Sequence, residues 1–341
     1  MRWYATNKRS LPWRSTRDPY KIWLSEVMLQ QTRVAQGLPY YHKFIGEFPT
    51  VKELAEASEK KVLKLWQGLG YYSRARNMHA TARVVASELQ GRFPETYEGL
   101  IQLKGIGDYT ASAIASVCFN KPEPVVDGNV YRVLSRYFGV DIPIDSPAGK
   151  TYFKKLAGKV MLAEAAGEYN QAIMEFGAIF CIPSKPDCHT CELQEGCIAY
   201  NQGRVESLPV KRRKAPAKKR YFNYLVPLDS KRNTHLRQRT DKGIWQQLYE
   251  FPLLESESSL NENTLRERLP EPYISFDNLT LELVNQKEIV HKLSHQHLYT
   301  RFWVMELDGS LEEGIPMENL ETYPVPVLIA DFIKTFKNSY F

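Results

Sequence analysis

Four cysteines in one short segment are the feature that most constrains this chain. Cys181, Cys188, Cys191 and Cys197 lie within 17 residues, with the spacing C-x6-C-x2-C-x5-C. Closing such short loops around one inorganic centre costs little chain entropy, and thiolates suit either a [4Fe–4S] cluster or Zn²⁺. Structural zinc sites usually repeat a C-x2-C pair, and this segment contains only one. The spacing therefore favours the cluster, with zinc and free or disulfide-bonded thiols as the alternatives.

The use of cysteine indicates a reducing compartment, and the lack of a long apolar run indicates that the chain does not span a membrane. Cys118 is the fifth cysteine and fits a small buried helix residue, so the chain does not resemble a secreted disulfide scaffold. No apolar run approaches the roughly 18 residues that span a bilayer, and Met1–Tyr4 lacks the apolar core of a signal peptide. We expect a cytoplasmic protein without membrane contact, associated with the nucleoid if the source is a bacterium.

Charge is distributed unevenly along the chain. Residues 1–210 carry 26 basic and 21 acidic side chains, whereas residues 221–341 carry 12 basic and 18 acidic ones. Between them, residues 211–220 (KRRKAPAKKR) hold seven basic side chains and no acidic one. This pattern indicates a polyanionic partner for the basic parts, although a solvated linker explains the central run equally well.

Hydrophobic spacing divides the chain into a helical half and an α+β half. We predict a helical region over 1–203, a basic linker over 204–220 and an α+β domain over 221–341. In the first half, helices are expected over Asp108–Phe119, from about Asn129, from Ser146-Pro147 to Gly167, and from Asn170 to Cys181. In the second half, strands are expected over Tyr221–Leu228, Thr280–Val284 and Leu298–Met305, and helices over Leu260–Leu269 and Val325–Lys337.

A glycine-containing hairpin between two helical segments could bind a phosphate. In Leu103-Lys104-Gly105-Ile106-Gly107, Gly105 and Gly107 allow a tight turn that directs backbone N–H groups outward at the start of the next helix. Such a nest of amides suits a DNA phosphate. A simple turn between helices fits the bare pattern equally well.

Two carboxylates have contrasting environments. Glu26 stands alone in an apolar helix, where desolvation raises a carboxyl pKa, and Asp127 precedes a helix whose free amides stabilise its ionised form. One protonated and one ionised carboxyl group suit the cleavage of a glycosidic bond. The simpler alternatives are an exposed glutamate and an ordinary helix cap.

Together these motifs resemble a known family. Residues 103–110, residues 126–133 and the four-cysteine segment resemble the helix-hairpin-helix DNA glycosylases of the endonuclease III superfamily. More narrowly, residues 23–32, Gly68–Tyr72 and Phe251-Pro252 resemble the adenine DNA glycosylases (MutY type). The resemblance implies a [4Fe–4S] cofactor and removal of adenine mispaired with 8-oxoguanine in double-stranded DNA. We expect the protein to act as a monomer.

The residue at position 109 distinguishes two reaction types within that superfamily. Bifunctional relatives, which also cut the strand, have a Schiff-base lysine there, whereas this chain has Tyr109 and its only nearby lysine, Lys104, precedes the hairpin glycines. The resemblance therefore implies a monofunctional glycosylase.

The resemblance also implies roles for individual residues. Glu26 would protonate N7 of the extruded adenine, Asp127 would stabilise the developing sugar cation, and Tyr109 and Asn129 would orient the site. Further positions match the residues that fill or wedge the base stack (Gln31 and Tyr71), those that contact DNA in the hairpin (Gly105 and Gly107), and those of the adenine pocket (Trp13, Arg14 and Gln171).

The second half resembles the Nudix-like domain that reads 8-oxoguanine in this family. It lacks the R-E-x-x-E-E helix of active Nudix enzymes, so we expect no pyrophosphatase activity. Ser294 and His295 match the residues that meet the oxidised base and the DNA backbone. Leu293 stands where the family commonly has phenylalanine, which removes aromatic stacking. Only a dozen residues precede Trp13, so we also expect a shortened N-terminal segment.

Three other functions remain possible from the sequence. One is a bifunctional endonuclease III-like glycosylase and lyase, which Tyr109 disfavours. Another is a catalytically silent damage-binding protein, which would need neither Glu26 nor Asp127. The last is a DNA-binding module stabilised by zinc.

Overall fold

The computed structural model describes residues 1–212 and 215–340, and packing divides the chain into two units. Unit 1 comprises Met1–Ala57 and Arg76–Lys214, and unit 2 comprises Ser58–Ala75 and Ala215–Phe341. The domain limits expected from the sequence, 1–203, 204–220 and 221–341, remain a prediction. The packing groups Ser58–Ala75 with the second unit.

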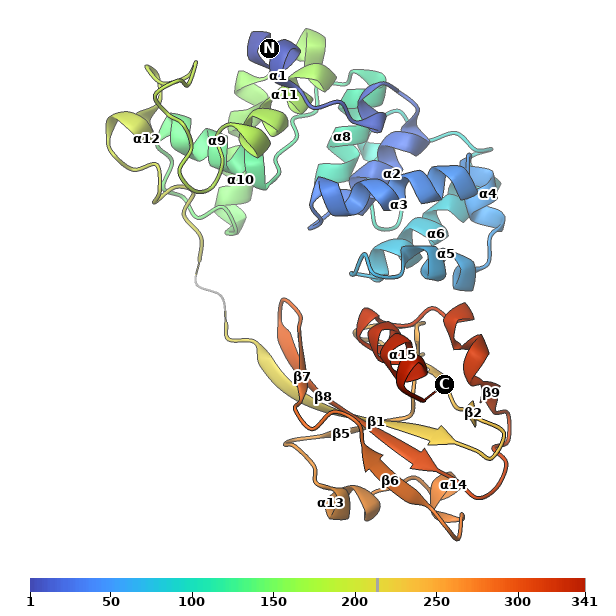
Figure 1. The fold of residues 1–341 in the computed structure, drawn as a ribbon. Coiled ribbons are helices and arrows are strands. Elements are labelled where there is room, and N and C mark those ends of the chain that lie inside the picture. Colours follow the sequence, from blue (N-terminus) through green and yellow to red (C-terminus); the bar gives the residue numbers. More distant parts are fainter. Residues whose placement is uncertain (213–214, 341) are drawn as a thin grey trace. The chain divides into compact units, whose positions relative to one another are not determined.

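Unit 1 is helical in its described part (Figure 1). Its helices are α1 (Arg2–Asn7), α2 (Pro19–Leu29), α3 (Val34–Glu47), α4 (Val51–Glu56), most of α6 (Ser73–Ser87), α7 (Tyr97–Ile101), α8 (Asp108–Phe119), α9 (Gly128–Phe138), α10 (Pro147–Val160), α11 (Ala166–Ile179) and α12 (Ile198–Asn201). Helix α5 (Glu59–Trp66) lies in unit 2.

Local signals determine where the helices around the site begin. Asp18 caps α2 by accepting the Tyr20 amide at 2.9 Å, and Pro19 occupies the first helical position. Thr50 and Glu53 form the capping box of α4. Helix α2 packs against α3 and α8, and α11 packs against α8 and α9. These contacts bring α2, α8, α9 and α11 together.

Two expected helix boundaries were wrong. Helix α10 ends at Val160 rather than at Gly167, and α11 begins at Ala166 rather than at Asn170. Gly167 lies inside α11, where an added Cβ would be 2.5 Å from the Ser116 carbonyl oxygen, so close packing on α8 requires glycine there. Asn170 is buried and bonds Ser116 and Val125 instead of capping a helix.

Unit 2 contains a mixed five-stranded sheet in the order β5-β1-β8-β6, with β7 also paired to β8. Its strands are β1 (Lys218–Leu228), β5 (Leu253–Ser256), β6 (Thr280–Leu283), β7 (Ile289–Lys292) and β8 (Gln296–Glu306). Strands β1 and β8 are parallel over their full length, and the other pairs are antiparallel. Small pairs join β2 (Asn233–Thr234) to β9 (Ile315–Pro316) and β3 (Arg237–Gln238) to β4 (Tyr249–Glu250).

Helices cover both faces of this sheet (Figure 1). On one face, Trp303 packs with Leu265 of α13 (Glu262–Arg266) and Tyr273 of α14 (Glu271–Ile274). On the other, Phe302 stacks on Phe332 of α15 (Val327–Tyr340) with ring centroids 3.9 Å apart. Adjacent residues of β8 thus serve opposite cores, as strand alternation requires. The expected α+β architecture is confirmed, with boundaries differing by a few residues.

Candidate active site

Four helices of unit 1 surround one pocket. Its volume is about 390 Å³, within the range of roughly 300–1,000 Å³ usual for small-molecule sites. Glu26 comes from α2, Tyr109 from the first turn of α8, Asp127 and Asn129 from the start of α9, and Met174 from α11. The structure therefore brings together the four residues that the sequence analysis assigned to catalysis.

Asp127 caps α9. Its Oδ1 accepts the amides of Asn129 at 2.9 Å and Val130 at 2.8 Å, and its Oδ2 accepts the Asn129 side-chain amide at 2.7 Å. Burial raises the pKa of Asp127, while these hydrogen bonds and the charge of Arg132 oppose the rise. The cap and the catalytic assignment are thus compatible, because the same donors that begin the helix also stabilise a negative charge beside the pocket.

Glu26 lies in a different environment. Burial raises the pKa of its carboxyl to about 7, a hydrogen bond from Tyr109 opposes the rise, and the charge of Asp127 adds to it. Burial is the largest influence at both carboxyl groups, but three hydrogen bonds and the charge of Arg132 oppose it at Asp127, whereas one hydrogen bond opposes it at Glu26. The two carboxyl groups are therefore suited to opposite roles, with Glu26 able to carry a proton near neutral pH.

Tyr109 offers a neutral hydroxyl to the site. Burial and the charges of Glu26 and Asp127 raise its pKa well above the usual value, and its hydroxyl lies 3.6 Å from Sδ of Met174. The residues that line the pocket in the described part of the chain include no lysine. Lys104 is exposed in the hairpin, where its carbonyl accepts the Thr81 hydroxyl at 2.6 Å.

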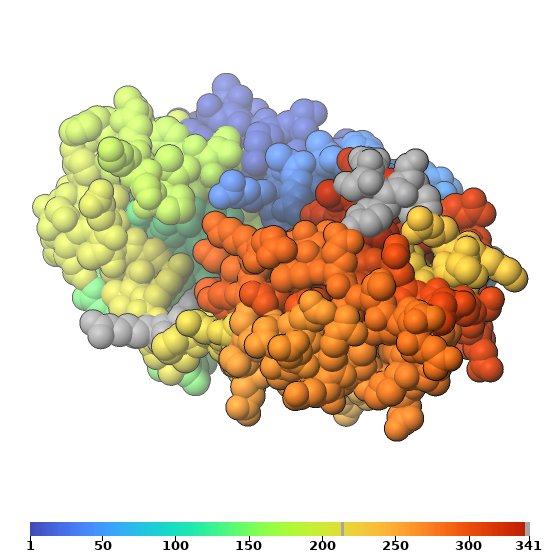
Figure 2. Space-filling view, turned by 60° about the horizontal axis from the view of Figure 1, so that its bottom comes forward, coloured from blue at the N-terminus to red at the C-terminus, as the bar shows by residue number. Residues whose placement is uncertain are grey.

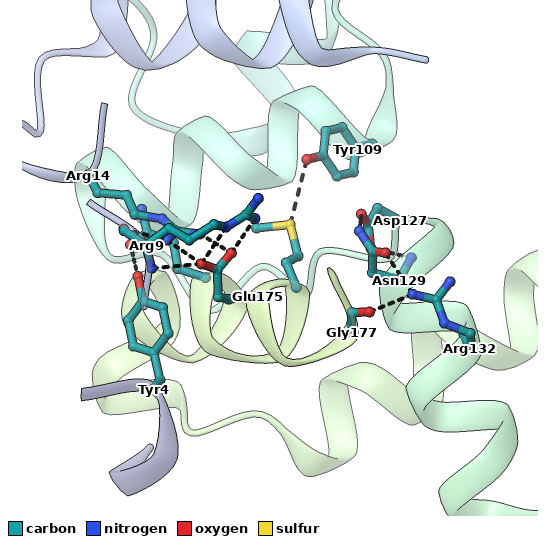
Figure 3. Close-up of polar contacts among 11 residues, drawn as sticks. Tyr4, Arg9, Arg14, Tyr109, Asp127, Asn129, Arg132, Glu175 and Gly177 are labelled. Atoms are coloured by element: carbon teal, nitrogen blue, oxygen red, sulfur yellow. Dashed lines mark hydrogen bonds and ion pairs between the residues drawn. The ribbon is translucent and has the colours of Figure 1, made fainter. Parts of the chain in front are cut away.

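Arg132, which the sequence analysis missed, connects the candidate catalytic residue Asn129 to the cysteine segment. Its Nη2 donates to Oδ1 of Asn129 at 2.9 Å and to the Gly177 carbonyl at 2.6 Å (Figure 3). Its Nε donates to the Cys181 carbonyl at 2.7 Å. The available signal was an arginine three residues after Asn129, among the apolar residues of α9.

The three residues that the sequence analysis assigned to an adenine pocket all line the pocket that contains Glu26 and Asp127. Trp13 is buried edge-to-face against Tyr41, with ring centroids 5.1 Å apart. Gln171 accepts the Tyr4 hydroxyl at 3.0 Å, and Arg14 forms an ion pair with Glu175 at 2.6 Å. Arg9 and Glu175 also line the pocket. The sequence analysis missed both, and the only signal for Glu175 was a lone acid among the apolar residues in the later turns of α11.

The residues expected to meet DNA lie at backbone positions of special geometry. Gln31 and Tyr71 are exposed and adopt left-handed φ values of 55° and 48°. Such values are uncommon for residues other than glycine and concentrate at functional sites. Gly105 has φ 80° and packs on Asn77, and Gly107 caps α8 with open space where a Cβ would stand.

The four cysteines line one small cavity next to α9. Arg136 donates to Sγ of Cys181 and the Leu193 amide donates to Sγ of Cys191, both at 3.4 Å. Donors directed at sulfur stabilise thiolates. The segment is thus suited to hold a thiolate-ligated group, as its spacing predicts.

A turn at the edge of two strands of unit 2 carries the residues expected to read the opposite base. Ser294 and His295 are exposed in the turn between β7 and β8, and Ser294 Oγ lies 3.3 Å from Nδ1 of His295. Leu293 closes this turn by donating its amide to the Gln296 carbonyl at 2.8 Å. Figure 2 shows unit 2 from a side on which its orange segments, from about residue 250 to 300, form a continuous surface.

Comparison with known families gives two matches along the chain. Residues 24–156 match the model described as HhH-GPD superfamily base excision DNA repair protein, and residues 223–335 match a NUDIX domain. No helix in the described part of the chain is long and apolar enough to cross a membrane.

Relatives that are similar over most of the chain share the name adenine DNA glycosylase. An adenine DNA glycosylase of Buchnera aphidicola (subspecies Baizongia pistaciae) is 34% identical over 89% of this chain and 84% of its own length. The adenine DNA glycosylase of Arabidopsis thaliana is 32% identical over 98% of this chain and 61% of its own. The human one is 43% identical over 60% of this chain and 39% of its own.

Solved structures resemble the helical half. A thermostable thymine-DNA glycosylase is 30% identical and superimposes with a TM-score of 0.55, over 59% of this chain and 93% of its own. A trapped endonuclease III–DNA covalent intermediate, 20% identical, has a TM-score of 0.52 over the same shares and supports the fold alone.

Proposed function

Because the chain belongs to the adenine DNA glycosylase family, we propose that it is a monofunctional enzyme that removes adenine opposite 8-oxoguanine in double-stranded DNA. It hydrolyses an N-glycosidic bond in base excision repair. The observation that carries the proposed mechanism is the pairing of Glu26, with a pKa of about 7, and Asp127, whose carboxylate accepts three hydrogen bonds, around a pocket lined by Tyr109. We further propose that the enzyme acts as a monomer.

The reaction begins with a base outside the helix, because the glycosidic bond of a stacked adenine is inaccessible. Glu26 donates its proton to N7 of that adenine, which makes the base a better leaving group. As the bond breaks, positive charge develops on the sugar, and the Asp127 carboxylate stabilises it. Asn129 holds Asp127 in place through the hydrogen bond at 2.7 Å. Water then adds to the sugar cation and loses a proton, which restores the acid form of Glu26.

The absence of lysine from the described lining supports a reaction without strand cleavage. A lyase step needs an amine that forms a Schiff base with the sugar. The Tyr109 hydroxyl, with its raised pKa, remains protonated and donates a hydrogen bond instead. We therefore expect an intact abasic strand as the product.

A [4Fe–4S] cluster is the proposed cofactor, held by Cys181, Cys188, Cys191 and Cys197. The four thiols line one cavity, and their spacing, with a single C-x2-C pair, favours a cluster over Zn²⁺. Bound there, the cluster would supply a covalent cross-link for the loop. Equal amounts of iron and acid-labile sulfide, without zinc, are expected in the purified protein, and stoichiometric zinc would contradict the assignment.

The mispair is proposed from the residues of unit 2 and from the family resemblance. Ser294 and His295 are exposed at one turn, where they are accessible to a DNA base and its backbone. Single-turnover excision should be measured on duplexes with adenine opposite 8-oxoguanine, guanine or thymine. We expect the order 8-oxoguanine, then guanine, then thymine. Equal rates on all three would contradict the proposed selectivity, and no release of adenine would contradict the activity.

A further inference from the structure

A buried glutamate ties the N-terminal segment to α11. The side chain of Glu175 is 1% exposed, and its carboxylate accepts hydrogen bonds from two arginines. Arg9 donates to it from Nε at 2.8 Å, Nη2 at 2.6 Å and its backbone amide at 2.9 Å. Arg14 donates from Nη1 at 2.8 Å and Nη2 at 2.6 Å. Figure 3 shows both guanidinium groups converging on this carboxylate.

The negative charge of Glu175 holds the two positively charged arginines against α11. Burial opposes ionisation of Glu175, but the hydrogen bonds from Arg14 and Arg9 outweigh it and lower the pKa of the carboxyl to about 2. Glu175 is therefore an anion at every working pH. It holds two like charges close together, and without its charge they would repel each other across a partly buried site.

The same residues form two walls of the catalytic pocket. Gln171, Met174, Glu175 and Ala178 line the pocket from α11, and their spacing of i, i+3, i+4 and i+7 places them on one face. Next to them, the segment Arg9–Arg14 contributes Arg9, Leu11, Trp13 and Arg14 to the lining. A second tie between the N-terminal part and α11 is the hydrogen bond from Tyr4 to Gln171.

We propose that Glu175 is a positioning residue that clamps the Arg9–Arg14 segment against α11 and so fixes the shape of the base pocket. The proposal rests on the proposed function, because it assigns the pocket to the extruded adenine. Glu175 acts through the two arginines and takes no part in proton transfer. It determines how firmly the pocket holds the base in the geometry that Glu26 and Asp127 require.

Glu175→Gln tests the clamp, because it keeps the shape of the side chain and removes the charge. Small displacements of a bound substrate reduce rates by roughly 100-fold, so we expect single-turnover excision from an adenine·8-oxoguanine duplex to fall by about 100-fold. Affinity for a duplex that contains an abasic product should stay within about twofold, because the clamp acts on the base and not on the DNA backbone. Glu175→Asp should recover part of the rate.

A matched control is Glu168→Gln, the same change at an exposed position in the first turn of α11, which should excise at the wild-type rate. Because Glu175→Gln could unfold the protein, Arg9→Gln provides a second variant at a side chain that is 37% exposed. A double-mutant cycle then joins Arg9→Gln and Glu175→Gln. If the two residues act as one clamp, the excision rate of the double variant is no lower than that of the more impaired single variant.

The outcomes separate the clamp from the function on which it rests. Wild-type protein that releases no adenine would contradict the proposed function itself. If the wild type is active and a folded Glu175→Gln variant excises adenine at the wild-type rate, the clamp is overturned. Single losses that multiply in the double variant would also overturn it, since two independent residues would then be involved. Should Glu175→Gln not fold, a folded Arg9→Gln variant that excises at the wild-type rate would overturn the clamp.

Discussion

Arg132 donates a hydrogen bond from Nη2 to Oδ1 of Asn129 at 2.9 Å. Because the other end of that amide donates to Asp127 at 2.7 Å, the guanidinium fixes which way the amide faces. Arg132 is itself held by the Cys181 carbonyl at 2.7 Å. A continuous series of hydrogen bonds thus runs from the backbone of Cys181 to the carboxylate of Asp127.

Arg132→Lys should weaken this series, because a single amine cannot replace donors on separate guanidinium nitrogens. Leaving a buried acceptor unpaired costs about 1–3 kcal/mol, so we expect a lower free energy of unfolding by about that amount. Excision should slow by at least about tenfold as Asp127 loses its fixed partner. Denaturant unfolding and single-turnover rates measure the two effects. Arg83→Lys, at an exposed position on α6, is the control, and equal behaviour of the two variants would refute the role of Arg132.

Glu26→Gln should bind an adenine·8-oxoguanine duplex and fail to release adenine. Glutamine keeps the size of the side chain but has no acidic proton, and loss of a general acid typically costs about 10²–10⁴-fold in rate. Gel-shift binding and single-turnover excision test the two parts. Glu88→Gln, an exposed change of the same kind, should behave as the wild type. Substantial turnover by Glu26→Gln would remove Glu26 from its assigned role.

The excision rate should depend on the protonation of Glu26. Its pKa of about 7 lies above the ordinary 4.5, so the proton that it donates is present below pH 7 and is lost as the pH rises through 7. We expect single-turnover rates to be highest below that pH and to decrease about tenfold for each unit above it. A rate–pH profile measures this limb. A flat profile between pH 6 and 9 would contradict the assignment of Glu26 as the acid.

Wild-type protein should not form an efficient covalent complex with DNA in the presence of borohydride. Trapping needs a Schiff base, and the described lining of the pocket offers Tyr109 but no lysine amine. A glycosylase that carries the lysine serves as the positive control, with the complex detected by denaturing electrophoresis. Strong trapping of this protein at the rate of adenine release would favour a bifunctional enzyme.

Ser294→Ala should reduce discrimination between 8-oxoguanine and guanine opposite the adenine. A single lost hydrogen bond is worth about 0.5–1.5 kcal/mol, so we expect the ratio of the two excision rates to fall by roughly three- to tenfold. Ser275→Ala, at another exposed position of unit 2, is the matched control. An unchanged ratio in Ser294→Ala would assign the recognition of 8-oxoguanine to other residues.

The sequence by itself was sufficient for features that depend on local chemistry. Four features can be read from short stretches of sequence because each depends on residues close together in the chain. They are the cap at Asp127, the hairpin glycines, the cysteine spacing and the tyrosine at position 109 in place of lysine. Strands β1, β6 and β8 of unit 2 were also predicted, whereas the shorter strands such as β5 and β7 were not. In β8, apolar residues such as Phe302 and Trp303 alternate between two cores.

Only the tertiary structure determined which distant residues share the pocket and how they are charged. Glu175 lies 166 positions from Arg9 in sequence, and Glu26 acquires its raised pKa from burial among helices that are separated in the chain. Gly167 likewise lies inside α11 instead of ending a helix, because α11 approaches α8 there too closely for a Cβ. The spacing of the four cysteines predicts a ligand set, but only hydrogen bonds between helices connect that segment to the carboxylate of Asp127 through Arg132 and Asn129. Local patterns specify caps and turns, whereas burial and charge pairing arise only when separate segments pack together.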